Sequence, residues 1–288
     1  MEQIEGLSIN SAAKVRLQSL SKQFLSYNFS CTTIDFDLKQ PYKVCFPSVG
    51  CIFLVVMNGE NFQQSFHTNT LPDTKKGYLH ISGLISSKPM VSSYHGKGFY
   101  SALKIHPVIC HYFLKENMRL FTNQHALVTD ILLKESKELR QLENNQDIAS
   151  FDNLYLERFL LKTLPCWTKI KKDPIYHAVN TIIKRKGMIK VRELADEYCM
   201  SERTLNRQFI MKVGISPKAY AKICQWQYVT TLLQKKPLIS LQDLSYLAGY
   251  YDNSHLVHDF KDRTSSTPSE FQQQTNCFMK RYLEYLTS

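Results

Sequence analysis

Three side chains with hydrogen-bonding ends stand at helical spacing in the last third of the 288-residue chain. Arg203, Asn206 and Arg207 occupy positions i, i+3 and i+4, so on an α-helix they share one face. Arginine can donate two hydrogen bonds to guanine O6 and N7, and asparagine can pair in the same bidentate way with adenine N6 and N7. This spacing therefore predicts the reading of base edges in a DNA groove.

The same stretch carries side chains that would hold such a helix in place. Leu205 and Phe209 lie four residues apart on a different face, and Ser201 stands where its hydroxyl can cap the helix N-terminus. Residues 191–198 predict a short preceding helix, and the next two residues a turn. We expect a helix-turn-helix unit over about residues 190–212, whose second helix enters the major groove.

The pattern occurs again about fifty residues later. Leu256 and Phe260 repeat Leu205 and Phe209 at an offset of 51, and a repeat that keeps its apolar positions in step indicates one supersecondary unit used twice. We expect the second unit over about residues 240–263. Its expected DNA-contacting residues are Asn253, Ser254, His258 and Lys261, with Arg263 as a further phosphate contact.

A single helix is predicted between the two units. Residues 217–233 begin with Pro217 and keep Tyr220, Ile223 and Leu232 at core spacing. Such a helix would hold the two recognition helices at a fixed separation. A separation near one turn of DNA, roughly 34 Å, would let one chain read two successive segments of the major groove.

The net charge of +11 is unevenly distributed. Residues 1–166 hold 17 basic and 14 acidic residues, a net +3, whereas residues 167–288 hold 19 and 11, a net +8. This asymmetry suits a polyanion such as double-stranded DNA. No stretch approaches the roughly 18 apolar residues of a membrane span, and the N-terminus has no secretory signal pattern. We expect a cytoplasmic protein that binds DNA and makes no membrane contact.

The sequence holds no pattern that indicates an enzyme or a metal site. No two of the eight cysteines are spaced C-x-x-C, and no histidine pair has metal-ligand spacing with a supporting carboxylate. G-x-S-x-G, H-E-x-x-H and Gly-rich phosphate loops are missing from the sequence. We expect no catalytic residue, no metal, no cofactor, and reduced, mostly buried thiols.

The first half predicts strands followed by helices. The apolar run 51–57 is closed by Asn58-Gly59, a dipeptide that favours a hairpin turn, and residues 78–85 and 99–105 predict further strands. After Pro107 helices are expected over residues 108–120, 124–142 and 151–164. The strands suit a β-sandwich or a small barrel.

The expected fold class is multidomain α and β. A strand-rich N-terminal regulatory domain with trailing helices covers residues 1–165, and residues 166–173 form a linker. An all-α domain of two helix-turn-helix units joined by a linker helix covers residues 174–288. Asp173-Pro174 marks its first helix, because aspartate caps free N–H groups and proline suits the first helical position.

The segment from about 174 to 272 resembles the DNA-binding domain of AraC/XylS-type transcription regulators. The residues that carry the resemblance are Glu193-Leu194-Ala195, Met200 to Leu205, Arg207, Phe209, Gly214 to Pro217, Tyr220 and Leu232-Leu233 in the first part, and Gly249-Tyr250, Asp252, Phe260-Lys261, Thr267-Pro268 and Phe271 in the second. The resemblance implies binding to promoter DNA and control of transcription, usually activation through contacts with RNA polymerase.

Several positions depart from the family pattern, most of them in the second unit. Arginine is usual where the chain has Gln225, His258 and Gln272, and a small alanine is common where it has Ser245. A neutral His258 carries no steady charge to a base or phosphate. The second unit is therefore expected to have weaker DNA chemistry than the first.

Four hypotheses remain for the whole chain. In the first, a small-molecule effector, whose binding residues are unknown, controls a homodimeric regulator through residues 1–165; in the second, a protein partner does so. An apolar cavity in the strand-rich part would favour the effector, and a solid core with an exposed apolar patch the partner. In the third, an N-terminal enzyme, such as a cysteine-based transferase, is tethered to DNA. In the fourth, the tandem units form a dimer scaffold that does not bind DNA.

Overall fold

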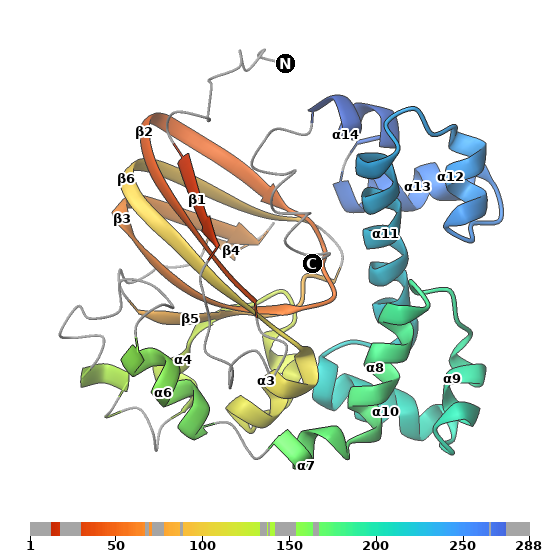
Figure 1. The fold of residues 1–288 in the computed structure, drawn as a ribbon, viewed down its shortest axis with the longest axis horizontal. Helices are drawn as coiled ribbons and strands as arrows, with labels where there is room; N and C mark the ends of the chain where they lie inside the picture. Colours follow the sequence, from red (N-terminus) through yellow and green to blue (C-terminus); the bar gives the residue numbers. More distant parts are fainter. Residues whose placement is uncertain are drawn as a thin grey trace.

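The computed structural model describes residues 13–17, 30–66, 69–70, 78–86, 89–132, 137, 139–141, 154–163, 167–264 and 266–274. Within these residues the chain combines an antiparallel sheet with a helical half beside it (Figure 1). This is the mixed α and β architecture that the sequence predicts.

The sheet has seven described strands in the order β1-β2-β6-β3-β5-β7, with β4 paired to β3. Their bounds are β1 Ala13–Leu17, β2 Ser30–Phe46, β3 Ile52–Phe66, β4 Asn69–Thr70, β5 Leu79–Ser82, β6 Met90–Ile105 and β7 His125–Leu127. The long strands β2, β3 and β6 bend together, so the sheet is strongly curved (Figure 1).

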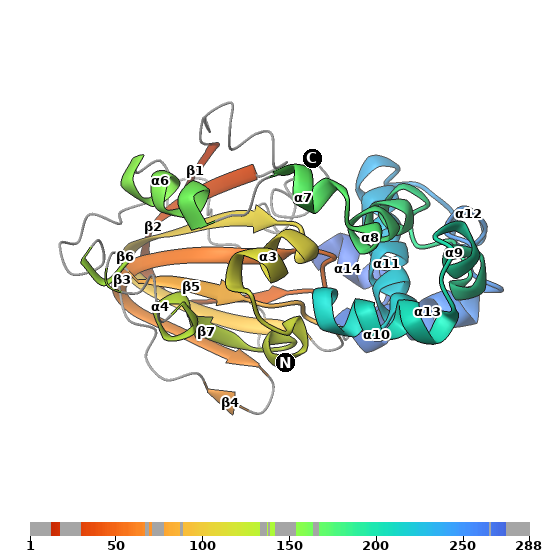
Figure 2. The ribbon, with the colours of Figure 1, turned by 90° about the horizontal axis from the view of Figure 1, so that it is seen from below.

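The two faces of the sheet carry different cores. Along β3, Ile52, Leu54 and Val56 belong to one cluster of buried side chains, and Phe53 and Val55 to another. Successive side chains of a strand point to opposite faces, so this continuous apolar run is buried on both sides. The first cluster also contains Val108, Phe113 and Val128 of helices that lie over the sheet in the view from below (Figure 2). The second is an aromatic-rich cluster of the sheet itself.

The hairpin expected at Asn58-Gly59 is wrong. β3 runs through this dipeptide, and Asn58 and Gly59 pair with Phe99 and Gly98 of β6. A register shift between Gly59 and Asn61 takes up the irregularity. The turn preference is local, whereas pairing along the whole length of β6 continues the ladder on both sides of the dipeptide, and the ladder prevails.

The helices after the sheet are shorter than predicted. They are α3 Pro107–Leu114, the 3₁₀ helix η1 Met118–Phe121, α4 Val128–Ile131, α6 Leu154–Thr163 and α7 Trp167–Lys171. The helix expected over 108–120 stops at Leu114, because Lys115 adopts a left-handed φ of 59°. The helix expected over 124–142 is wrong at its start, because residues 125–127 form β7 on the edge of β5.

The helical half contains α8 Pro174–Lys184, α9 Val191–Glu197, α10 Glu202–Val213, α11 Pro217–Lys235, α12 Leu241–Leu247, α13 Asn253–Thr264 and α14 Pro268–Gln274. Asp173 and Ser201 cap α8 and α10 as expected, and Ser216 caps α11. Of the described helices, none combines the length and the hydropathy that crossing a membrane requires.

One core cluster runs from the sheet into the helical half. It joins Leu103 of β6 and Phe113 of α3 to Phe209 of α10 and Tyr220 of α11. A separate cluster, which includes Trp226 of α11, Leu244 of α12 and Leu256 and Phe260 of α13, forms the core of the second helix-turn-helix unit. The first cluster contains residues on both sides of the predicted linker, so the core does not mark a boundary there. The domain limits at residues 165 and 174 therefore remain a prediction.

Candidate DNA-binding surface

The first helix-turn-helix unit consists of α9 and α10. Leu205 and Phe209 are fully buried, and the Ser201 hydroxyl accepts the Thr204 N–H at 3.1 Å. Cys199 adopts a left-handed φ of 51° in the turn, in the position where the sequence predicts the chain to change direction. Helix α10 is thus anchored by one face and capped at its start.

The outer face of α10 carries the predicted reading residues. Arg203, Asn206 and Arg207 are all exposed, and the structure brings them together on one helix. Within the described part of the chain, no hydrogen bond or ion pair engages these three side chains. Ile210, which follows Arg203 by seven residues on the same helix, is half-buried. The hydrogen-bonding groups of the two arginines and the asparagine are therefore available to an external ligand.

The second unit consists of α12 and α13 and repeats this construction. Leu256 and Phe260 are buried, and the rings of Phe260 and Trp226 lie 6.1 Å apart. Asp252 Oδ1 accepts the His255 N–H at 2.7 Å, so aspartate caps α13 as predicted. The apolar positions that the repeat aligns have the same structural role in both units.

The outer face of α13 differs from that of α10. Asn253, Ser254, His258 and Lys261 are exposed, as predicted. However, Asn253 Oδ1 accepts a hydrogen bond from Ser245 at 2.8 Å, and His258 Nδ1 lies 3.3 Å from the Asp262 carboxylate. Two of the four candidates are thus partly engaged within the protein.

Arg263 does not lie on the outer face, so its expected role at phosphate is wrong. Its side chain is only 11% exposed, and its Nε lies 3.5 Å from Asp259 Oδ1. Asp259 also accepts a hydrogen bond from the Tyr250 hydroxyl at 2.6 Å. A carboxylate one turn earlier therefore draws the guanidinium inward.

The residues that depart from the family pattern make specific contacts in the second unit. Gln225 Nε2 donates to Ala248 O at 2.7 Å and ties α11 to the turn between α12 and α13. Gln272 Nε2 donates to the carbonyl oxygens of Leu233 and Pro237, both at 3.0 Å. These glutamines stabilise the fold through backbone contacts, which isolated sequence positions do not reveal.

The two recognition helices lie on the same side of the helical half. In Figure 1, α10 lies near the lower end of α11 and α13 near its upper end. Seen from below, both lie along the same edge (Figure 2). The 19 residues of α11 correspond to a length of roughly 28 Å at the usual helical rise.

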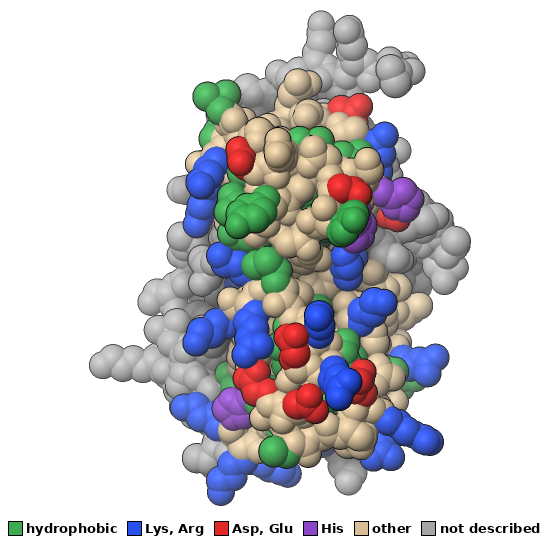
Figure 3. Space-filling view, turned by 90° about the vertical axis from the view of Figure 1, so that its right-hand side faces the viewer, with side chains coloured by type: hydrophobic (Ala, Val, Ile, Leu, Met, Phe, Trp, Pro, Cys, Tyr) green, Lys and Arg blue, Asp and Glu red, His purple; other side chains and the backbone are tan. Residues whose placement is uncertain are grey.

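The adjoining face of the helical half is not uniformly basic. Figure 3 shows Lys and Arg side chains interspersed with Asp and Glu in its lower part, and exposed hydrophobic side chains in its upper part. This face is therefore not a continuous positive surface of the kind that attracts DNA non-specifically.

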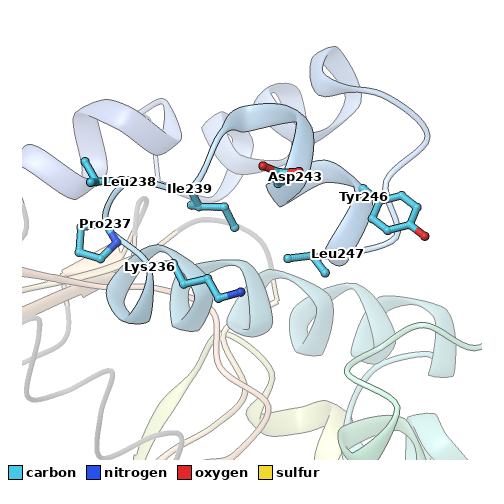
Figure 4. A pocket seen from close by; sticks show the side chains of 7 residues that line it. All are labelled: Lys236, Pro237, Leu238, Ile239, Asp243, Tyr246 and Leu247. Atoms are coloured by element: carbon cyan, nitrogen blue, oxygen red, sulfur yellow. The ribbon is translucent and has the colours of Figure 1, made fainter.

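A shallow groove of about 600 Å³ lies in the second unit and was not predicted (Figure 4). Its lining residues are Lys236, Pro237, Leu238, Ile239, Asp243, Tyr246 and Leu247. Leu238 is 99% exposed and Tyr246 82% exposed, so apolar side chains that normally avoid water border the groove. The sequence signal that could have indicated this groove is Pro237-Leu238, which lies between two helical patterns.

A polar cluster at the junction of the two halves was not predicted from the sequence. Asp173 Oδ2 accepts hydrogen bonds from Lys212 Nζ of α10 at 2.6 Å and from the Tyr112 hydroxyl of α3 at 2.9 Å. Burial alone would raise the pKa of Asp173, but the bonds from Lys212, the Ile175 N–H and Tyr112 outweigh it and the pKa is lowered. We call Tyr112, Asp173 and Lys212 the junction cluster.

The described residues contain no group of three or more His, Cys, Asp or Glu side chains that could hold a metal ion. Burial raises the pKa of the Cys51 thiol to about 12 and raises those of Cys110 and Cys224 as well. A thiol in that state is a poor nucleophile, because the thiolate is the reactive form.

Comparison with known proteins supports the assignment of the helical half. A family model described as "Helix-turn-helix domain" matches residues 194–274. The HTH-type transcriptional activator RhaS of Yersinia pestis bv. Antiqua (strain Angola) is 25% identical over 138 residues, which cover 45% of this chain and 48% of RhaS. The chain carries an AraC-type helix-turn-helix domain. It spans about half the length of the relatives that it matches.

Two solved structures align over most of the chain at low identity. ToxT from Vibrio cholerae O395 has a TM-score of 0.44 and 12% identity, and the alignment covers 90% of this chain and 98% of ToxT. The AraC-like transcriptional activator CuxR has a TM-score of 0.31 and 10% identity, and the alignment covers 79% of this chain and 88% of CuxR.

Proposed function

We propose that the chain is a sequence-specific, double-stranded DNA-binding transcription regulator that activates from promoter sites. The observation that carries this proposal is the outer face of α10, where Arg203, Asn206 and Arg207 are exposed and unengaged within the described residues. An anchored, capped helix that presents two arginines and an asparagine has the donors and acceptors to read guanine and adenine edges.

The second unit extends the site along the DNA. Lys261 is suited to a phosphate, and Asn253, Ser254 and His258 to weaker base contacts. The length of α11, roughly 28 Å, supports a spacing near one DNA turn, roughly 34 Å. We expect a site of two blocks, with the larger share of sequence information in the block that α10 contacts.

The sheet-containing half is proposed to be regulatory and to bind a small-molecule effector. The curved sheet carries an aromatic-rich buried cluster in which Tyr94 and Tyr100 pack edge to face, 6.2 Å apart. These side chains pack against one another, so a mainly apolar ligand with one polar end would need an apolar cavity beside them, and such a cavity is the feature that distinguishes an effector from a protein partner. A thermal-shift screen of small molecules on the intact chain tests this, and a rise in Tm is the expected result.

Two further partners follow from an activating role. We propose that the chain works as a homodimer on DNA and contacts RNA polymerase at the promoter. RhaS, which is 25% identical to this chain over 138 residues, is itself named a transcriptional activator. An enzymatic role is not favoured, because burial raises the pKa of the Cys51, Cys110 and Cys224 thiols.

The test of DNA recognition is selection from a random double-stranded library with the intact chain at a stated salt concentration. The expected result is an enriched motif of two blocks about one helical turn apart. A loss of binding with salt but no enriched motif would contradict the proposal, because it would indicate non-specific polyelectrolyte contact. In later comparisons with Arg203→Ala and Arg207→Ala, the matched control is Arg140→Ala, which removes an equal charge from an exposed position of the sheet-containing half.

A further inference from the structure

The junction cluster connects the first recognition helix to the sheet-containing half. Lys212 lies in the last turn of α10, Tyr112 in α3, and Asp173 caps α8. The Asp173 side chain is 1% exposed and that of Lys212 is 15% exposed, so this ion pair is largely removed from water. A buried carboxylate with several partners fixes the position of each of them, because leaving it unpaired is costly.

A second contact holds the same end of α10. The Thr122 hydroxyl, directly after η1, donates to the carbonyl oxygen of Gly214 at 2.9 Å, and Gly214 ends α10 with a φ of +100°. A Cβ on Gly214 would lie 2.6 Å from Thr122 Oγ1 and 2.8 Å from Met118 O. The backbone at the end of α10 is thus packed directly against η1.

The apolar contacts also differ between the two helix-turn-helix units. The core of the first unit is continuous with the sheet and α3, whereas α12 and α13 have a core of their own. On the second-unit side, Phe271 of α14 also packs against the sheet's aromatic-rich cluster. α10 is therefore fixed to the sheet-containing half by a shared core and two polar contacts, and α13 is attached through α11 and α14.

We propose that Asp173 is a positioning residue for DNA recognition, which sets the angle of α10 through Lys212 and Tyr112. This inference rests on the proposed DNA-binding function. Because Arg203 and Arg207 are exposed while the junction cluster is formed, the cluster holds α10 in an orientation that leaves its reading face open. Loosening the cluster therefore lowers discrimination between DNA sequences and leaves the DNA-contacting side chains unchanged.

The experiment measures the ratio of affinities for the selected site and a scrambled site, with the full chain. Asp173→Asn keeps the acceptor that caps α8, whose Ile175 N–H lies 2.8 Å from Oδ1, but removes the charge that holds Lys212. Tyr112→Phe removes a single hydrogen bond and is the milder variant, which decides the question if Asp173→Asn does not fold. Glu197→Gln is the matched control: it changes the charge equally and breaks the exposed pair with Arg185 at 2.8 Å.

The expected result is a ratio that falls roughly fivefold in Asp173→Asn, in the range of couplings between sites, falls less in Tyr112→Phe, and is unchanged in Glu197→Gln. Combined with Arg207→Ala, Asp173→Asn has a smaller effect than in the native chain, because fewer α10 contacts remain to be misaligned, but combined with Lys261→Ala it keeps its full effect. An unchanged or raised ratio in both junction variants would overturn the proposal, as would equal losses in the two combined backgrounds, which indicate general destabilisation. A native chain without any sequence preference overturns the proposed function and this inference together.

Discussion

The two helix-turn-helix units have the same construction but different surroundings. In the first, α10 shares a core with the sheet-containing half, and Arg203, Asn206 and Arg207 make no hydrogen bond or ion pair within the described residues. In the second, α13 has a core of its own, and Asn253 and His258 are partly engaged by Ser245 and Asp262. The comparison indicates that a repeat preserves the scaffold more readily than the interactions available on its surface.

Truncation of the two equivalent core leucines should give the largest contrast. Leu205→Ala and Leu256→Ala each remove a side chain that is at most 1% exposed, so each should cost about 3 kcal/mol of unfolding free energy. Hydrogen exchange should accelerate in both α10 and the sheet for Leu205→Ala, but in α12, α13 and the adjoining part of α11, and not in the sheet, for Leu256→Ala. Faster exchange throughout the chain in both variants would contradict the division into two cores.

The next largest contrast is expected in DNA affinity, between alanine substitutions on the outer face of α10 and on that of α13. Arg203→Ala and Arg207→Ala should each weaken binding to the selected site by about 2 kcal/mol, because each removes a bidentate donor. His258→Ala should change affinity by less than about threefold, because His258 Nδ1 lies 3.3 Å from the Asp262 carboxylate and an imidazole lacks the bidentate donor pair of arginine. Titration of labelled DNA by fluorescence anisotropy measures both. A larger loss for His258→Ala than for Arg207→Ala would reverse the assignment of the two units.

Low pH should reduce stability through the sheet-containing half, where a histidine is buried. Burial lowers the pKa of His106 from 6.5 to about 3, despite the nearby Asp173 carboxylate, and its Nδ1 accepts the Val108 N–H at 3.2 Å. The unfolded chain binds this proton more readily, so stability is full above pH 6.5 and falls below it, by about 1.4 kcal/mol per pH unit for this group.

Urea unfolding at pH 7 and pH 5 tests this dependence. His106→Asn keeps a side-chain acceptor at the start of α3 but removes the titration, so it should lose less stability at pH 5 than the native chain. Part of the dependence should remain, because burial and the neighbouring His80 also lower the pKa of His125. His258→Asn alters an exposed histidine of the second unit and is the control for the substitution itself. An identical slope in His106→Asn and the native chain would contradict this account.

The smallest effect is expected at Ser245. Its hydroxyl lies 2.8 Å from Asn253 Oδ1 and 2.9 Å from the Leu241 carbonyl oxygen, and its single proton can be donated to only one of them. Ser245→Ala should change the unfolding free energy by about 0.5 kcal/mol, because the net value of such a bond is small. It should also free Asn253, so binding to the second block should stay equal or improve slightly in the anisotropy titration. A clear loss of second-block binding would show that the serine holds Asn253 in its reading position.

Local signals explain which features could be predicted from the sequence. Ser201 and Asp252 cap the helices that follow them, and the apolar spacing of Leu205 and Phe209 recurs in the second unit, so both units were predictable from neighbouring residues. The continuation of β3 through Asn58-Gly59 was not, because β6 pairs across the dipeptide from about forty positions away.

The site shows the same distinction between local and distant causes. Exposure of Arg203 and Arg207 follows from helical periodicity, which a sequence displays. The inward position of Arg263 depends on Asp259 and the packing of α13, and the junction cluster joins residues 39 and 61 positions apart. Contacts of that separation are set by tertiary packing, so no local pattern announces them.

Library selection with three full-length proteins tests most directly the claim that α10 reads one block of a two-block site. The proteins are the native chain, Arg207→Ala and His258→Ala, compared at one salt concentration. The account predicts that Arg207→Ala loses sequence information in a single block and keeps the other, while His258→Ala leaves that first block intact. Equal loss in both blocks for either variant, or no enriched motif for the native chain, would contradict it.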